Sequence, residues 1–345
     1  MKEENTKSVT PERILQVGMG FWASKTLLTA IKLELFTHLG DQKLSSQEIK
    51  QKLGLHGRGF YDFMDALVAL GFLERDGIES SATYGNTTET SLFLDKNKES
   101  YIGGILEMAN NRLYRFWGFL EEALITGEAQ SEVTRGEKPF FEELYADEER
   151  LNEFVSAMAG IQMGNFVSFA KKFDFSHYKT LCDIGGAGGF LCAQVAMLNP
   201  HMQCMSFDMP VVCKIAEKNI KHMHLNEQVK IIEGDFFKDS FPKADIITMG
   251  NILHDWGLKD KKLLINKAYE ALPEGGAFIV IENIIDNDRR HNAFGMMMSL
   301  NMLIETPEGF DYSFNRLKEW TEEAGFKQIS SIPLTGATSA AIAIK

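Results

Sequence analysis

Cysteine and positive charge are both scarce in this sequence. The 345 residues include four cysteines, spread along the chain and without a CxxC pair, so neither a disulfide framework nor a structural zinc site is expected. Lys and Arg number 36 against 48 Asp and Glu, which gives a formal net charge of −12. Nucleic acids and anionic membranes are bound through basic surfaces, so the charge balance argues against both as the main partner.

Long apolar runs are scarce as well. Residues 1–13 are polar and lack the apolar segment of a secretory signal. No apolar stretch approaches the ~18 residues needed to span a bilayer. Hydrophobic residues make up 44% and charged residues 24%, the balance of an ordinary globular protein. We therefore expect a cytoplasmic protein without a membrane span, whose cysteines are small buried side chains in a reducing compartment.

The first hundred residues predict a small, mostly helical domain. Apolar residues at helical spacing predict a first helical segment over residues 11–36. A capping box of Ser45 and Glu48 predicts a short helix that ends at Gly54. A third helix, over about residues 58–70, precedes a predicted β-hairpin. Helices followed by a hairpin are typical of a winged-helix fold.

A winged helix raises the alternative of DNA binding, and the charges oppose it. The helix in the recognition position carries one basic residue, Arg58, and two acidic ones, Asp62 and Asp65, so it would repel phosphate. The first helical segment is apolar on more than one face, including Phe21 and Trp22, which is more than a small three-helix core can bury. A dimer interface explains this surplus best.

The remaining residues form two regions of different character. Residues 101–175 predict helices rich in aromatic residues, which we expect to form a linker or a substrate lid. Their periodicity does not show which aromatic side chains belong to the core and which line a ligand pocket. Residues 176–345 alternate strands and helices, which predicts an α/β fold with a Rossmann-like, doubly wound parallel sheet. Strands are expected at 180–184, 203–207, 229–233, 244–249 and 277–282, helices near 190–198, 211–222, 259–272 and 314–324, and a closing antiparallel hairpin at 327–333 and 338–344.

A glycine-rich turn follows the first strand of this sheet. Gly185, Gly186, Gly188 and Gly189 occupy four of five successive positions, where the absence of Cβ lets a ligand approach the backbone. The spacing fits neither the dinucleotide fingerprint GxGxxG nor a Walker loop, since no Gly-Lys-Ser/Thr follows. Asp183, which closes the strand, suits a ligand that bears an ammonium group rather than a pyrophosphate.

Acidic residues also end the next two strands. Asp208, at the tip of the second strand, can accept both hydroxyls of a ribose. Asp235, after the third strand, offers an acceptor for the amino group of adenine, and Phe236 beside it offers an aromatic wall. Ammonium, ribose and adenine together describe S-adenosylmethionine (SAM). The alternative is that these acids only cap helices, but three of them at successive strand ends favour the cofactor.

The fourth and fifth strands bring candidate catalytic residues to the same edge. His254 follows the fourth strand, and α/β sheets bind ligands outside the carboxyl ends of their strands. The ordinary pKa of a histidine, about 6.5, suits a group that accepts a proton at neutral pH. Glu282, at the end of the fifth strand, can fix one imidazole tautomer and stabilise the imidazolium. A histidine that only caps a helix is the alternative.

In combination these motifs resemble the class I SAM-dependent O-methyltransferases that act on small aromatic hydroxyls. The resemblance rests on Asp-Ile-Gly-Gly-Ala-Gly-Gly at 183–189, Gly-Asp-Phe-Phe at 234–237, Leu-His-Asp-Trp at 253–256 and the winged-helix N-terminus, and it covers about residues 13–345. This family includes plant caffeate-type, acetylserotonin and bacterial polyketide methyltransferases of secondary metabolism. It implies an intertwined homodimer built by the N-terminal domain.

The resemblance implies roles for individual residues. His254 is expected to be the general base, with Glu282 as one flanking acid. The second flanking acid is usually a Glu, and Asp311 stands there, followed by Tyr312 where the family carries Arg. The expected site comprises the catalytic residues His254, Glu282 and Asp311; the cofactor-binding residues Asp183, Gly185, Gly186, Asp208, Asp235, Phe236, Gly250, Asn251 and Trp256; and the substrate-binding residues Phe154, Met158, Ile161, Met298 and Met302, without a metal ion.

These features predict transfer of a methyl group from SAM to a phenolic oxygen, with S-adenosylhomocysteine as product. Met298 and Met302 belong to a Met-rich stretch that suits a plastic apolar wall, although a plain core helix explains it equally well. Three alternatives stay open: an N- or C-methyltransferase, a SAM-binding enzyme that transfers no methyl group, and a SAM-sensing winged-helix regulator. His254 favours proton abstraction and thus O-methylation, and a regulator would need a basic recognition helix.

Overall fold

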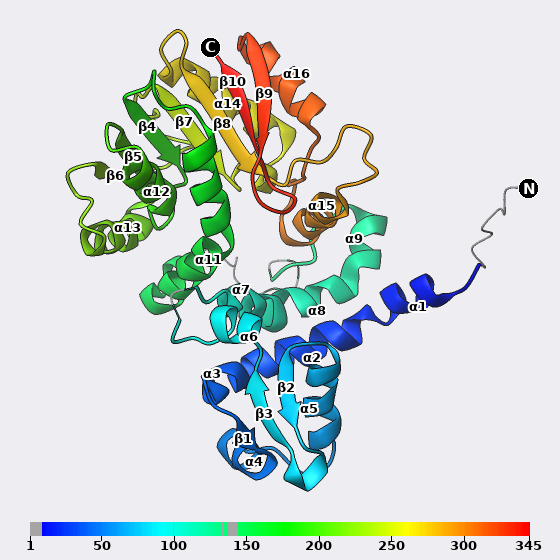
Figure 1. The fold of residues 1–345 in the computed structure, drawn as a ribbon. Helices are drawn as coiled ribbons and strands as arrows, with labels where there is room; N and C mark the ends of the chain where they lie inside the picture. The colour runs from blue at the N-terminus through cyan, green and yellow to red at the C-terminus, as the bar shows by residue number, and fades with distance from the viewer. Residues whose placement is uncertain (1–8, 99, 133, 135, 137–143) are drawn as a thin grey trace, which may run out of the picture. The chain divides into compact units, whose positions relative to one another are not determined.

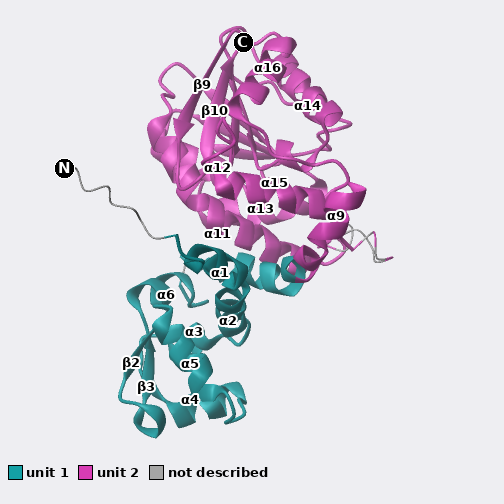
Figure 2. Cartoon of the chain, turned by 90° about the vertical axis from the view of Figure 1, so that its right-hand side faces the viewer, with its two compact units in different colours: residues 1–114 teal, residues 115–345 magenta. Residues whose placement is uncertain are grey.

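The chain forms two compact units, residues 1–114 and residues 115–345 (Figure 2). The computed structural model describes residues 9–98, 100–132, 134, 136 and 144–345. Each unit has a hydrophobic core of its own. The boundary between the two units falls inside the segment 101–175, for which the sequence predicts a helical linker or lid.

The N-terminal unit combines short helices with a small antiparallel sheet, as predicted (Figure 1). The capping box is present, because the Glu48 carboxylate accepts the backbone N–H of Ser45 at 2.8 Å and the Glu48 N–H donates to the Ser45 hydroxyl. Gly54 ends that helix with φ 62°, a conformation that glycine adopts without strain. The elements are α1 (Glu12–Gly18), α2 (Gly20–Lys32), α3 (Leu35–Leu39), β1 (Leu44–Ser45), α4 (Ser46–Leu53), α5 (Phe60–Ala69), β2 (Leu73–Asp76), β3 (Thr83–Asn86), α6 (Thr88–Phe93) and α7 (Gly103–Met108), with the sheet order β1-β3-β2.

Apolar side chains on α1 and α2 are exposed in the single chain. Ile14, Val17 and Trp22 are 77%, 75% and 61% exposed, so the predicted surplus of apolar surface is present. By length and composition alone, the 21-residue run Glu12–Lys32 is also apolar enough to cross a membrane. The expectation that no apolar stretch is this long missed this run, in which polar residues such as Gln16, Ser24 and Lys25 stand among the apolar ones. Core helices of soluble proteins and signal sequences meet the same two criteria, so a single run of this kind is weak evidence of a membrane span.

The C-terminal unit is built on a seven-stranded sheet. Its order is β6-β5-β4-β7-β8-β10-β9, in which the first five strands are parallel and β10 pairs antiparallel with both β8 and β9. The predicted parallel sheet and its closing hairpin are thus confirmed. Strand order reverses at β4, which lies between β5 and β7, and this is where α/β sheets bind ligands. The strands are β4 (Thr180–Ile184), β5 (Gln203–Asp208), β6 (Val229–Glu233), β7 (Ile246–Gly250), β8 (Ala277–Glu282), β9 (Gln328–Pro333) and β10 (Ser339–Ile344).

Helices cover both faces of this sheet (Figure 1). Leu181 and Cys182 are successive residues of β4; Leu181 packs into the core beneath α11 and α12, and Cys182 into the core beneath α14 and α16. Because successive side chains of a strand point to opposite faces, a sheet covered on both sides needs apolar residues throughout. The helices are α11 (Glu148–Lys172), α12 (Phe190–Leu198), α13 (Pro210–His222), α14 (Leu258–Ala271) and α16 (Phe314–Ala324).

Two further helices of the C-terminal unit pack together. α9 (Leu120–Thr126) and α15 (Ala293–Glu305) share a small core in which Ala123 and Ile304 are fully buried. The Trp117 Nε1–H donates to Asn301 Oδ1 at 2.9 Å, which joins the segment before α9 to α15. These contacts fix α15, the helix that carries the Met-rich stretch.

Candidate active site

The glycine-rich turn lies at the carboxyl end of β4. Gly185 has φ 71°, and its N–H donates to the Phe207 carbonyl at 2.9 Å. A Cβ on Gly185 would collide with Ile252, and one on Gly186 would collide with the Ser206 hydroxyl. Both positions therefore require glycine, and the turn stays close to its neighbouring elements.

Asp208 anchors this turn to the tip of β5. Its Oδ2 accepts the backbone N–H of Ala187 at 2.8 Å, and its Oδ1 accepts the N–H of Met209 at 2.7 Å. Burial raises the pKa of Asp208, and the two backbone hydrogen bonds oppose that rise. The carboxylate thus lies at the strand tip, where the sequence places it.

Asp183 belongs to β4, two residues before Gly185, and its side chain reaches Thr248 of β7. Its Oδ1 accepts the Thr248 hydroxyl at 2.7 Å, and the residue is 5% exposed. Burial raises the pKa of Asp183 to about 7, while the hydrogen bond from Thr248 lowers it and the charge of Asp208 raises it further. The charge of Asp183 therefore depends on pH near neutrality.

The end of β6 supplies a carboxylate and an aromatic cluster. Asp235 accepts the backbone N–H of Phe237 at 2.9 Å, and its ion pair with Lys238 at 2.8 Å lowers the pKa of the carboxyl. The rings of Phe236 and Phe237 meet Trp256 edge-to-face, at centroid distances of 5.9 and 4.6 Å. Trp256 Nε1 is buried and has no hydrogen-bond partner within the described part of the chain.

Gly250 and Asn251 lead from β7 to the segment that carries His254. Asn251 has φ 52°, and its N–H donates to the Ile281 carbonyl at 3.1 Å. This left-handed residue bends the chain away from the strand, so that His254 follows in a short helical turn at the carboxyl edge of the sheet. A Cβ on Gly250 would meet no atom within 4 Å, so open space adjoins the backbone there.

His254 lies between two carboxylates. Its Nδ1 is 3.4 Å from Asp311 Oδ1, and its Nε2 is 3.4 Å from Asp255 Oδ1. The residue is 7% exposed, and among the described residues neither His254 Nδ1 nor Asp311 Oδ2 has a hydrogen-bond partner of good geometry. Asp311 reaches the imidazole although it is shorter than the family's Glu, and its N–H donates to Ser299 of α15 at 3.1 Å.

The carboxylates around His254 raise the pKa of its imidazole. Burial is the largest single influence and would lower that pKa, because it disfavours the charged form. Asp255, Asp311 and Glu282 together outweigh burial. A proton taken up by the imidazole is thus stabilised by three negative charges.

Glu282 meets the backbone of His254 rather than its ring. Glu282 Oε1 accepts the His254 N–H at 3.3 Å, and Oε2 accepts the Tyr312 hydroxyl at 2.5 Å. Burial raises the pKa of Glu282, whereas the charge of His254 and the hydrogen bond from Tyr312 lower it. Glu282 therefore influences the imidazole in two ways: through its negative charge, and by holding the backbone N–H of His254.

Three residues near the site had no role in the sequence-based prediction. Asp255 belongs to the Leu-His-Asp-Trp motif, yet the prediction gave roles only to its neighbours His254 and Trp256. Lys261 is fully buried on α14, where the helical spacing to Leu264 would have indicated an inward position. Burial raises the pKa of Tyr145 to about 12, and the charges of Asp208 and Asp255 raise it further.

The predicted substrate residues come from α11 and α15. Phe154 packs in a cluster with Ala187 of the glycine-rich turn, which brings the start of α11 to the cofactor side of the site. Among the described residues, no group of three or more His, Cys, Asp or Glu side chains is arranged to hold a metal ion. Of the other predicted substrate residues, Met302 is buried, Met158 and Met298 are half-buried, and Ile161 is 39% exposed.

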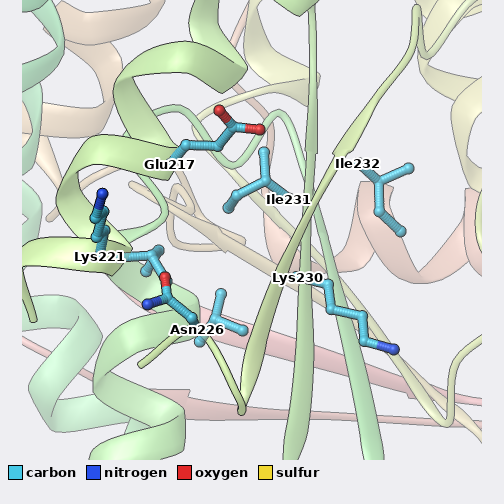
Figure 3. Close-up of a pocket in the computed structure, with 8 residues that line it drawn as sticks. Glu217, Lys221, Asn226, Lys230, Ile231 and Ile232 are labelled. Atoms are coloured by element: carbon cyan, nitrogen blue, oxygen red, sulfur yellow. The ribbon is translucent and has the colours of Figure 1, made fainter. Parts of the chain in front are cut away.

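A separate pocket lies away from these residues. It has a volume of about 510 Å³ and lies between α13 and the edge strand β6, where Glu217, Lys221 and Ile231 line it (Figure 3). None of the predicted site residues lines this pocket. It therefore belongs to the edge of the sheet and not to the site at the strand ends.

Residues 117–327 match the O-methyltransferase domain family, and residues 15–96 match the O-methyltransferase dimerisation domain. The chain belongs to the SAM-dependent O-methyltransferase family. It is 38% identical to the tetracenomycin polyketide synthesis 8-O-methyl transferase TcmO of Streptomyces glaucescens, over 97% of both chains. It is 30% identical to the N,N-dimethyltransferase OxyT of Streptomyces rimosus, over 91% of this chain and 90% of that one.

A solved O-methyltransferase shares the fold over almost the whole length. Human N-acetylserotonin methyltransferase in complex with SAM superposes with a TM-score of 0.89 and 28% identity, covering 99% of both chains. The matched dimerisation domain supports a homodimer, and the exposed apolar residues of α1 and α2 lie in or beside it. The protein is thus a SAM-dependent O-methyltransferase.

The residues of this O-methyltransferase fit its cofactor. Open space adjoins Gly250, where a Cβ would meet no atom within 4 Å, and Trp256 Nε1 offers a buried donor without a partner in the described part of the chain. Asp208 stands at the tip of β5, beside the turn at which the strand order reverses. Open space beside the strand end, a buried donor without a partner and a carboxylate at this edge suit a nucleoside with a charged tail.

Proposed function

We propose that the enzyme methylates a phenolic hydroxyl of a small aromatic metabolite of the polyketide type. The observation that carries this proposal is the position of His254, buried between Asp255 and Asp311 at the carboxyl end of β7. An imidazole enclosed by carboxylates is suited to take the proton of a phenol. The relative named for tetracenomycin polyketide synthesis supports an aromatic polyketide as acceptor.

SAM supplies a methyl group on a positively charged sulfur. In the proposed arrangement Asp208 binds the ribose hydroxyls, Asp183 the ammonium group, and Asp235 the adenine. The remaining cofactor contacts are assigned to Gly185, Gly186, Phe236, Gly250, Asn251 and Trp256.

His254 accepts the phenol proton and leaves a phenolate as the nucleophile. Asp311, 3.4 Å from the imidazole, and Glu282, bound to the His254 backbone, stabilise the imidazolium that forms. An anion forms beside a cationic sulfur, and in a water-poor site this pairing favours reaction over separation of the charges. The chain contributes proton removal and alignment of the acceptor.

The acceptor would lie between α11 and α15. Phe154, Met158 and Ile161 of the first helix and Met298 and Met302 of the second form the proposed apolar walls. Methionine adapts to irregular shapes and makes favourable contacts with aromatic rings, which suits a planar polycyclic substrate.

The decisive experiment is a methyl-transfer assay with the full chain. Purified protein is incubated with labelled SAM and a panel of simple phenols, aromatic polyketides and indoles, and each phenol has a matched aniline as control. We expect label to enter at least one phenol, with S-adenosylhomocysteine released in equal amount. Binding of SAM without methylation of any acceptor would contradict the proposal.

Amine methylation is a second candidate, because one relative is an N,N-dimethyltransferase at 30% identity. A neutral amine already carries its lone pair, so it needs no base before attack. The aniline arm of the panel separates the two reactions: label in the anilines alone would replace the phenol by an amine.

The proposal includes a homodimer formed through the N-terminal unit, and a cytoplasmic location. The exposed apolar residues of α1 and α2 support the dimer. Four free and buried cysteines support a reducing compartment. Light scattering on the full chain should give twice the mass of one chain, and a monomer at micromolar concentration would remove this part of the proposal.

A further inference from the structure

The loop between α15 and α16, residues 306–313, packs closely against the segment that carries His254. Gly309 of this loop is buried. An added Cβ on Gly309 would stand 2.7 Å from the Asp255 carbonyl oxygen and 2.8 Å from the His254 carbonyl oxygen. Steric repulsion excludes a carbon atom at these distances. The loop therefore reaches the two carbonyls because this residue has no side chain.

A second glycine lies on the other side of this contact. Gly257, three residues after His254, faces the side chain of Glu308. An added Cβ on Gly257 would collide with the Glu308 carboxylate and lie 3.0 Å from the Glu308 Cβ. Glycine in both segments lets their backbones approach more closely than side chains would allow.

Hydrogen bonds hold the loop from the side of α15. The Thr306 hydroxyl accepts the Gly309 N–H at 2.8 Å and donates to the Met302 carbonyl at 2.8 Å. The Asp311 N–H donates to the Ser299 hydroxyl at 3.1 Å. The loop is therefore fixed between α15 and the segment that follows β7, and an atom added at Gly309 would displace it from one of them.

The contact between Asp311 and His254 depends on this placement. Asp311 stands two residues after Gly309, and its Oδ1 lies 3.4 Å from His254 Nδ1. The backbone of His254 is held separately, because its N–H donates to Glu282 at 3.3 Å. The distance from Asp311 to the imidazole is already long for a hydrogen bond, so a small outward shift of the loop would remove the contact.

We propose that Gly309 is a positioning residue that sets the distance from the Asp311 carboxylate to the His254 imidazole. It does so by lying, without a side chain, against two backbone carbonyls of the His254 segment. This inference rests on the proposed role of His254 as general base. A carboxylate beside the imidazole stabilises the imidazolium that forms when the acceptor's proton is taken up. Gly309 thus affects proton transfer through Asp311.

The test is a double-mutant cycle with Gly309→Ala and Asp311→Asn in the full chain. It is measured as kcat/KM for the phenol of the acceptor panel that is labelled fastest. Asp311→Asn keeps the shape of the side chain and removes its charge, so we expect a loss of about ten- to a hundredfold, as for a hydrogen bond to a charged group. Gly309→Ala should lose about tenfold, with SAM affinity unchanged. In the double variant the losses should not multiply, because both act on one contact.

The pH profile gives a second readout. The charge of Asp311 favours the protonated imidazole, so losing this contact should lower the pKa of His254 and move the acidic limb of kcat/KM to lower pH. Asp255 and Glu282 act on the imidazole in the same sense and keep their charges in these variants. Gly309→Ala should move the limb in the same direction as Asp311→Asn. Losses that multiply in the double variant, or a loss by one factor at every pH, would mean that Gly309 only supports packing, and the inference would fail.

Gly118→Ala is the matched control, because Gly118 is exposed and an added Cβ there would meet no atom within 4 Å. It should leave kcat/KM and its pH profile unchanged. If Gly309→Ala does not fold, Thr306→Val and Thr306→Ser carry the test. The valine removes the hydroxyl that accepts the Gly309 N–H and should reproduce part of the loss, whereas the serine keeps a hydroxyl and should behave as wild type. Equal activity of these two variants would then overturn the inference.

An NMR titration of the His254 imidazole, with isotope-labelled histidine in the full chain, separates this inference from the proposed function. The signal is assigned by its absence in His254→Ala. A lower His254 pKa in Gly309→Ala, but not in Gly118→Ala, supports the positioning role, whatever the assays show. If His254→Ala retains activity, the base proposal fails. If that variant is inactive while the pKa of His254 is the same in Gly309→Ala and wild type, only the positioning role fails.

Discussion

The two sides of the active site hold their charged groups differently. On the cofactor side neutral donors hold two of the three acids: Asp208 accepts two backbone N–H groups, and Asp183 accepts a threonine hydroxyl. On the acceptor side charged groups lie against one another, with His254 at 3.4 Å from both Asp255 and Asp311. We therefore expect the acceptor side to titrate as one coupled group.

This difference has a consequence for mutagenesis. A substitution on the cofactor side should change SAM affinity without changing the pH dependence of turnover. A substitution on the acceptor side should change the protonation of its neighbours, because interactions among close charges are not additive.

The largest effect is expected at His254. His254→Ala should lower turnover with a phenolic acceptor by about 10²–10⁴-fold, the usual contribution of a positioned general base. SAM affinity should be nearly unchanged, which calorimetry measures. Raising the pH toward the phenol's pKa of about 10 should partly restore turnover, because solvent then supplies the phenolate. Full activity in the variant would place the base elsewhere.

In the wild-type enzyme the acidic limb of kcat/KM should have a midpoint above the ordinary histidine value of about 6.5. The neighbouring carboxylates raise the pKa of His254, so the free base appears only as the pH rises through that higher value. A midpoint at or below 6.5 would show that the three acids do not act on the base.

Asp208 should give the largest effect on the cofactor side. Asp208→Ala removes the ribose acceptor and leaves the backbone N–H groups of Ala187 and Met209 without their partner. We expect SAM binding to weaken by about 1–3 kcal/mol, as for loss of a charged hydrogen bond. Calorimetry of Asp208→Ala and Asp208→Asn measures this, and Asn should retain part of the affinity because it keeps one acceptor oxygen. Unchanged affinity in both variants would remove Asp208 from the cofactor site.

Two glycines at the site allow a matched comparison. An added methyl on Gly186 would collide with the Ser206 hydroxyl, whereas one on Gly250 would meet no atom. Gly186→Ala should therefore lower both the melting temperature and SAM affinity, the latter by about tenfold, since overpacking typically costs 1–3 kcal/mol. Gly250→Ala should keep the melting temperature, so a loss of SAM affinity there would report contact with the cofactor itself.

A smaller effect is expected from Asp183 and pH. Burial raises the pKa of Asp183 to about 7, so its carboxylate is charged only above that pH. If it binds the cofactor's ammonium group, SAM affinity should rise several-fold as the pH passes upward through 7. Asp183→Asn should abolish this dependence while keeping an acceptor for Thr248. A pH dependence that persists in the Asn variant would have another origin.

Tyr312→Phe should give the smallest change. In the wild type, the Tyr312 hydroxyl donates a hydrogen bond to Glu282, and this bond lowers the pKa of the carboxyl. The substitution removes that bond. Glu282 should then hold a proton more readily, so less negative charge faces His254. The acidic limb of the pH profile of kcat/KM should move slightly to lower pH. A shift to higher pH would contradict this account of Glu282.

Much of the fold could be predicted from the sequence because its signals are local. The alternation of apolar strands and helices, the capping box at Ser45 and the hairpin at the C-terminus each depend on neighbours within a few residues. The prediction of one helical segment over residues 11–36 was less accurate. Glu34 adopts φ 54° and separates α2 from α3, and a glutamate gives no indication of such a break.

The candidate site also has one part that could be predicted from the sequence and one part that could not. The sequence by itself determined where the proposed cofactor residues lie, because Asp183, Asp208 and Asp235 stand at or just after the ends of successive strands and parallel strands bring their carboxyl ends to one edge. Only the tertiary structure decided the acceptor side. His254, Glu282, Asp311 and Lys261 lie on separate segments, and their contacts depend on how loops and helices pack above the sheet. Burial and mutual charge set the protonation of these groups, and neither quantity exists until the chain is folded.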